Sequence, residues 1–186
     1  AGDGEDVISG GGGNDAIDIT GDAASRDELI RAGNGTTDGY DTITGFRLGF
    51  PATPDRITFT TNAAKVGGVA VTDYSEGGLP TEVFATTGFQ VLGNNMVVAN
   101  AAIGPTEAEI ETYLGDKEIF HNGATGDAIY IAADNGVDTF IFLITEGADG
   151  VGGASDKQFD AAQDTGIAIM RITNLNNVTA LFSGNF

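Results

Sequence analysis

Two successive nonapeptides begin the chain, AGDGEDVIS at residues 1–9 and GGGGNDAID at residues 10–18. The second nonapeptide fits the repeat G-G-x-G-x-D-x-U-x, in which U is a large apolar residue, at every fixed position. The first fits it at all but one position, where Ala1 replaces a glycine. The shared positions are Gly2 and Gly11, Gly4 and Gly13, Asp6 and Asp15, and Ile8 and Ile17. A generic Gly/Asp-rich linker is the alternative, but a linker has no reason to keep isoleucine in register.

These residue types suit a calcium ion. Glycine lets the backbone adopt positive φ and turn its carbonyl groups into a loop, to which the following aspartate adds a carboxylate. Calcium takes about six to eight oxygen ligands, which carbonyls and carboxylates supply together. The apolar residue two positions after the aspartate begins a very short strand and points into the core. One such unit cannot bury its apolar face alone, so successive turns must stack.

Residues 1–18 resemble the repeats-in-toxin (RTX) calcium-binding parallel β-roll. In that family two nonapeptides form one turn, and each ion lies between loops of successive turns on the same side. The resemblance implies that Ca2+ is the cofactor and that further repeats precede residue 1. The implied metal-binding positions in this stretch are Gly2, Gly4, Asp6, Gly11, Gly13 and Asp15.

The repeat pattern weakens beyond residue 18. Asp22 is a further candidate ligand, although the glycine pattern of the repeat is lost around it. Ser25 and Glu28 have the spacing of a capping box, which predicts a short helical turn over 25–31. The motif then returns over residues 32–43, AGNGTTDGYDTI, which we interpret as a final, expanded calcium loop; a surface β-turn cluster is the alternative. Its candidate ligands are Gly33, Gly35, Asp38 and Asp41.

Residues 41–59 predict the end of the roll. The sequences DTITGF (41–46) and DRITF (55–59) resemble the segment that closes many RTX β-rolls. The apolar residues expected to cover the last turn are Ile43, Phe46, Ile57 and Phe59. We therefore expect a calcium-binding β-roll with its cap over residues 1–60, and a β-rich C-terminal domain over residues 61–186.

The C-terminal domain is predicted to be rich in strands, at 66–72, 83–92, 96–102, 128–133, 137–145 and 166–173. Asp134-Asn135-Gly136 predicts a hairpin, and Thr139–Ile144, apolar on both faces, predicts a central buried strand. One helix is predicted with Pro105 in its first turn and Gly115 at its end, and a second helical turn is expected near 156–162. The expected fold is mainly β: a short calcium-binding parallel β-roll followed by a strand-rich domain with one or two short helices.

Composition excludes several classes of function. The chain carries 27 acidic and 8 basic residues, a net charge of -19, which repels nucleic acid. No apolar run approaches about 18 residues, so we expect no membrane insertion. Cysteine is absent, and the lone histidine, His121, lies in the turn sequence FHNG. No nucleophile stands beside a base, so we expect no enzymatic activity.

The ending SGNF (183–186) and the strands before it resemble the C-terminal module of type I secretion substrates. The two resemblances imply a calcium-binding structural protein, extracellular or on a bacterial cell surface, of the S-layer, sheath, filament or adhesin kind. It would leave through the type I secretion machinery, then fold and assemble with itself or with neighbouring surface proteins. The alternative is a calcium-dependent folding and secretion module of a larger enzyme whose catalytic domain lies upstream. A small free-standing enzyme is the third hypothesis, for which the sequence offers no site.

Overall fold

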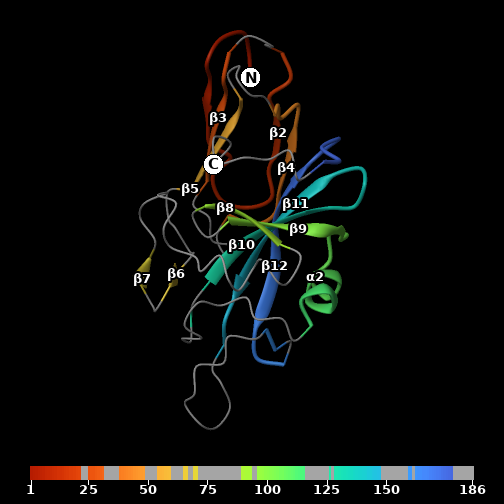
Figure 1. Ribbon diagram of the computed structural model, residues 1–186. Coiled ribbons are helices and arrows are strands. Elements are labelled where there is room, and N and C mark those ends of the chain that lie inside the picture. The colour runs from red at the N-terminus through yellow and green to blue at the C-terminus, as the bar shows by residue number, and fades with distance from the viewer. Residues whose placement is uncertain are drawn as a thin grey trace.

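In the computed structural model the described residues form a mainly β protein with two sheets and one short helix (Figure 1). The structure describes residues 1–21, 25–31, 38–48, 54–59, 65–66, 69–70, 89–93, 96–115, 126, 128–147, 159–160 and 162–177. His121 and most of the second helical turn predicted near 156–162 lie outside these residues. Within them, no helix is long and apolar enough to cross a bilayer.

The first five strands alternate between the two sheets. Three of them pair in parallel in a three-stranded sheet: β1 (Val7–Ile8), β3 (Glu28–Arg31) and β5 (Arg56–Phe59). The intervening strands, β2 (Ala16–Asp18) and β4 (Asp41–Thr44), pair in parallel in the second sheet. In Figure 1 these strands occupy the N-terminal end of the molecule. We refer to residues 1–59 as the N-terminal turns.

The register of these strands stacks apolar residues in two rows. One row consists of Ile8, Leu29 and Ile57. The other consists of Ile17, Ile43 and Ile172, the last from the C-terminal half of the chain. The pairs Leu29/Ile57 and Ile43/Ile172 are buried, and Ile8 and Ile17 pack against the same cluster from the first turn. Stacking thus supplies the burial that strands this short cannot achieve singly.

The helical turn predicted over 25–31 is wrong, because residues 28–31 form strand β3. Leu29 and Arg31 point inward while Glu28 and Ile30 are half-buried, which is the alternation of a strand. Pairing with β1 and β5 on both sides satisfies the backbone of β3 and outweighs the local capping signal.

Among the described residues the second sheet has nine strands, and it runs from the N-terminal turns into the C-terminal half of the chain. Its strand order is β2-β4-β12-β11-β10-β6-β7, with β9 pairing with both β10 and β8. The C-terminal strands are β6 (Lys65–Val66), β7 (Val69–Ala70), β8 (Phe89–Gly93), β9 (Met96–Ala102), β10 (Ala128–Asp134), β11 (Thr139–Thr145) and β12 (Thr165–Ile172). β4 and β12 pair in parallel, so the sheet crosses the domain boundary predicted at residue 60.

The predicted hairpin is confirmed. β10 and β11 are antiparallel, with Asp134 opposite Thr139 at the turn. β11 lies between β10 and β12, and its first six residues are buried, as the apolar run Thr139–Ile144 predicts. Alternate residues of β10 and β11 belong to two apolar clusters on opposite faces of the sheet.

One of these clusters ties the N-terminal turns to the C-terminal sheet. It contains Ile43, Phe46 and Ile57 from the turns together with Tyr130 and Met170 from the sheet. The rings of Phe59 and Tyr130 stack with their centroids 4.5 Å apart and an interplanar angle of 10°. The four apolar residues predicted to cover the last turn are all buried in this cluster.

The helix predicted between Pro105 and Gly115 is confirmed as α2 (Glu107–Leu114). Thr106 is its N-cap, and Thr106 and Glu109 form a reciprocal capping box. The hydrogen bonds from the Thr106 side chain and backbone lower the pKa of Glu109. Ile110 and Leu114 are buried, and α2 lies against β12 (Figure 1).

We expect Phe59→Ala to lower the free energy of unfolding by about 3 to 5 kcal/mol, since it removes a buried ring that joins the turns to the sheet. Urea unfolding followed by tyrosine fluorescence measures the loss. Thr106→Ala is the control, which acts only on the helix cap and should cost about 1 kcal/mol. If both variants lowered the free energy of unfolding equally, the packing of the N-terminal turns against the C-terminal sheet would not depend on Phe59.

Candidate functional site

Every strand of the N-terminal turns has an aspartate at its first residue or directly before it. Asp41 is the first residue of β4, and the other four directly precede their strands. The five, which we call the strand-start aspartates, are Asp6, Asp15, Asp27, Asp41 and Asp55. Their carboxylates lie between successive turns, where the strands stack.

Main-chain N–H groups link these aspartates into two ladders. At the starts of the first sheet's strands, the Asp6 N–H donates to Asp27 Oδ1 at 3.1 Å, and the Asp27 N–H donates to Asp55 Oδ1 at 3.1 Å. At the starts of the second sheet's strands, the Asp15 N–H donates to Asp41 Oδ1 at 3.0 Å. Each bond holds one turn against the next and fixes the position of a carboxylate.

Two ladder carboxylates have a buried oxygen that accepts no hydrogen bond from any described residue. These atoms are Asp15 Oδ2 and Asp27 Oδ2. Asp27 is 1% exposed, so water cannot replace the missing partner from outside. Burial of an ionised carboxylate without a partner costs several kcal/mol. The arrangement therefore calls for a cation beside each of these oxygens.

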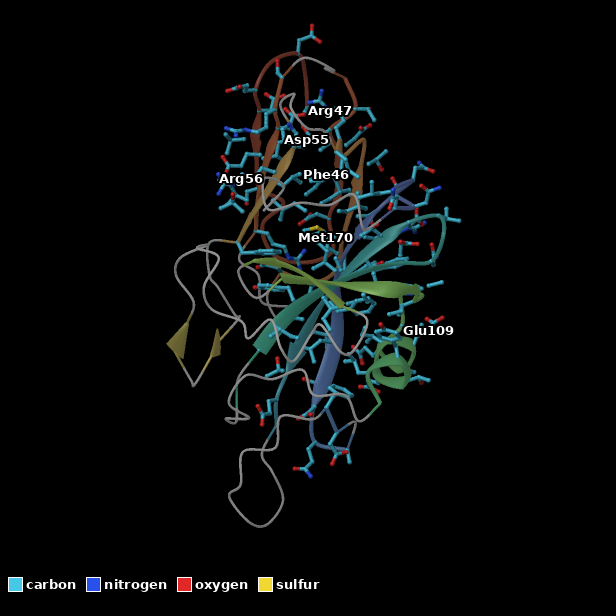
Figure 2. The ribbon with its side chains drawn as sticks, in the orientation of Figure 1. Phe46, Arg47, Asp55, Arg56, Glu109 and Met170 are labelled. Carbon is cyan, nitrogen blue, oxygen red and sulfur yellow. The ribbon has the colours of Figure 1, made fainter. Side chains whose placement is uncertain are left out.

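The last carboxylate of each ladder is compensated within the chain. Asp41 Oδ2 accepts a hydrogen bond from the Arg31 guanidinium, and both side chains are buried. Both carboxylate oxygens of Asp55 accept hydrogen bonds from the Arg47 guanidinium, at 2.9 Å for Oδ1 and 3.3 Å for Oδ2 (Figure 2). Burial raises the pKa of Asp41, and the hydrogen bond from the Asp15 N–H and the charge of Arg31 oppose that rise.

The glycines of the second nonapeptide form an open loop before Asp15. Gly11 and Gly13 have φ of +89° and +101°, a conformation that other residues rarely adopt. At Gly10 the constraint is space, because a Cβ there would lie 2.6 Å from Asp15 Oδ2. The loop thus brings bare backbone close to the unpaired carboxylate oxygen.

The other predicted ligands fall in three groups. Gly2 and Gly4 belong to the first loop, where the Gly2 N–H donates to Asp6 Oδ2 at 2.9 Å and Gly4 has φ of +111°. Asp38 is buried, and its charge raises the pKa of Arg31 against the larger opposing effect of burial. The predicted ligands outside the described residues are Asp22, Gly33 and Gly35.

A site of this kind would take most of its oxygens from main-chain carbonyls, with one or two carboxylates. Among the described residues, no three acidic, histidine or cysteine side chains converge as a metal site would require. The buried oxygens of Asp15 and Asp27, and the bare glycine backbone beside Asp15, nevertheless fit a calcium ion.

Sequence reasoning missed four residues of the ladders, namely Asp27, Arg31, Arg47 and Asp55. The signal for the two aspartates was the pattern of an aspartate, any residue and a large aliphatic residue. It occurs as Asp27-Glu28-Leu29 and Asp55-Arg56-Ile57, just as at Asp15-Ala16-Ile17. Nothing in the sequence identifies the arginine partners, which depend on how the turns stack.

No family model, no curated protein and no solved structure matches this chain. The chain is therefore assigned to no family, and its function is inferred from its own geometry.

We expect Asp15→Asn to weaken calcium binding by roughly tenfold or more, because it removes a ligand charge while preserving shape. In excess chelator the same variant should be more stable than the unaltered protein, because it no longer buries an unpaired charge. Calorimetric titration and thermal melts measure the two effects.

Asp18→Asn is the matched control. Asp18 is exposed, and its Oδ1 accepts hydrogen bonds from the Thr20 backbone and hydroxyl, which lower its pKa. The control should leave calcium affinity unchanged. Equal affinities for the two variants would mean that the carboxylate of Asp15 is not a ligand.

Proposed function

We propose that this chain is a calcium-binding extracellular structural or surface protein, secreted by a type I system, whose N-terminal turns form an RTX-type parallel β-roll. The observation that carries the proposal is the pair of buried carboxylate oxygens, Asp15 Oδ2 and Asp27 Oδ2, that lack a partner among the described residues. Parallel strands that alternate between two sheets support the β-roll.

Calcium would act by compensating charge. Residues 1–18 contain five acidic side chains and no basic one, within a chain of net charge -19. In a low-calcium cytoplasm, mutual repulsion and the buried carboxylates oppose stacking of the turns. Outside the cell, calcium binds the stacked state alone and stabilises it by mass action.

Assembly would use the open edges of the two sheets. Among the described residues, β5 and β7 are terminal strands of their sheets, each paired on one side only. A second copy or a neighbouring surface protein could add a strand there once calcium has reduced the repulsion.

The alternative is a folding and secretion module of a larger secreted enzyme whose catalytic domain lies upstream. The apolar cluster shared by the turns and the C-terminal sheet favours this function. Through that cluster, calcium binding at the turns would stabilise the whole C-terminal region after export.

We expect excess chelator to lower the melting temperature by about 10 °C or more and to reduce the β signal in circular dichroism. Calcium should restore both, whereas magnesium should substitute poorly because it demands tighter geometry and loses water reluctantly. An unchanged melting temperature in chelator would exclude a calcium-dependent fold.

Particle size separates the two functions. For a structural protein, light scattering should show growth across a calcium titration to millimolar concentration, with no growth in magnesium. A calcium-folded chain that stays monomeric throughout would favour the secretion module.

A further inference from the structure

Gly10 and Arg31 occupy equivalent positions in successive turns. Continuing the β1–β3 register by two residues beyond Ile8 and Leu29 places Gly10 beside Arg31. In the later turn, Arg31 points between the sheets and reaches the carboxylate of Asp41. In the earlier turn, Gly10 has no side chain, and the carboxylate beside it, Asp15, has an unpaired oxygen.

The other ladder shows the same contrast. Asp55, in the later turn, accepts the Arg47 N–H at 2.8 Å in addition to the two guanidinium bonds (Figure 2). Asp27, one turn earlier, has only the Asp6 N–H on Oδ1 and no partner on Oδ2 among the described residues. In both ladders, therefore, an arginine binds the last carboxylate, whereas Oδ2 of the preceding carboxylate accepts no hydrogen bond among the described residues. Arg31 nevertheless lies near enough to Asp15 for the two charges to interact.

We propose that Arg31 and Arg47 are permanent cations that replace calcium in the last turn, so that calcium is required only at Asp15 and Asp27. This inference rests on the proposed calcium-binding function and specifies how many ions it takes and where. On this inference, the two arginines determine how many calcium ions the chain binds.

The guanidinium is well suited to this replacement. It is always charged and donates through a planar fork, which matches the contact of Arg47 with both oxygens of Asp55. Arg31 also donates to the Gly39 carbonyl at 2.6 Å, so it binds a carboxylate and a carbonyl together, as a metal ion in a loop does. Unlike calcium, it stays in place when calcium is withdrawn.

The surroundings of Arg31 have room for an ion in its place. A cavity of about 160 Å³ lies between the sheets, lined by Gly10, Arg31, Asp38, Asp41 and Met170 among others. Shortening Arg31 would enlarge this cavity and leave the carboxylates of Asp38 and Asp41 without the guanidinium. Calcium with part of its hydration shell could then take the same position.

The last turn is also the part of the roll that meets the C-terminal sheet. β4 pairs with β12, and Phe59 of β5 stacks on Tyr130. Arginine compensation keeps this junction formed at any calcium concentration. The earlier turns then add to a preformed base when calcium arrives, which restricts the calcium-dependent step to the N-terminal end of the roll.

The test compares Arg31→Met with Arg26→Met, a control that removes the same charge from an exposed position. Calorimetric calcium titration should give one more bound ion per chain for Arg31→Met than for the unaltered protein. In chelator, Arg31→Met should melt about 10 °C lower than the control, and calcium should remove most of that difference. Arg47→Met should behave in the same way.

Two further variants keep the test decisive if Arg31→Met does not fold without calcium. Arg31→Lys retains a cation and should bind no additional ion. The double variant Arg31→Met/Asp41→Asn removes both charges, and in chelator it should be more stable than Arg31→Met alone.

The outcomes separate this inference from the function on which it rests. If the unaltered protein binds no calcium, the proposed function fails, while the double variant in chelator still tests charge compensation by Arg31. If the unaltered protein binds calcium but Arg31→Met binds the same number of ions, the inference is overturned. A chelator melt of Arg31→Met equal to that of Arg26→Met would overturn it as well.

Discussion

Stacking the short N-terminal strands places an aspartate at the start of each strand. The carboxylates of Asp27, Asp41 and Asp55 each accept the main-chain N–H of the aspartate in the preceding turn. That bond sets the spacing of the turns and also takes charged groups out of water. A carboxylate held in this way needs a cation, because burial without one costs more than the hydrogen bond contributes. The glycine-rich loops and the arginine contacts both follow from this requirement.

The chain compensates these charges in two ways. Arg31 and Arg47 accompany the last carboxylates, and Arg171 accompanies Asp138 at the start of β11 through bonds of 2.6 and 2.9 Å. With 8 basic residues against 27 acidic ones, the chain has too few basic side chains to pair with every carboxylate. The proposed calcium ions at the remaining carboxylates would let so acidic a chain stack its turns.

Apolar packing makes the turns and the C-terminal sheet one structure. The row Ile17, Ile43 and Ile172 runs through three strands, and the last of them lies far away in the sequence. Phe59 and Tyr130 add an aromatic contact between β5 and β10. Through this packing, a change in the stability of the turns also changes the stability of the second sheet. Calcium binding as proposed would therefore stabilise the C-terminal half as well.

Elements with strong local or periodic signals could be predicted from the amino-acid sequence. They are the hairpin at Asp134, the buried strand Thr139–Ile144 and the helix that ends at Gly115, because turn chemistry, two-sided apolarity and caps act within a few residues. Only the tertiary structure decided that residues 28–31 form a strand, since pairing with β1 and β5 outweighs a local capping signal. It alone also decided which aspartates receive an arginine. Arg31 and Asp41 are ten residues apart in the chain and come together only because their strands belong to different sheets that face each other.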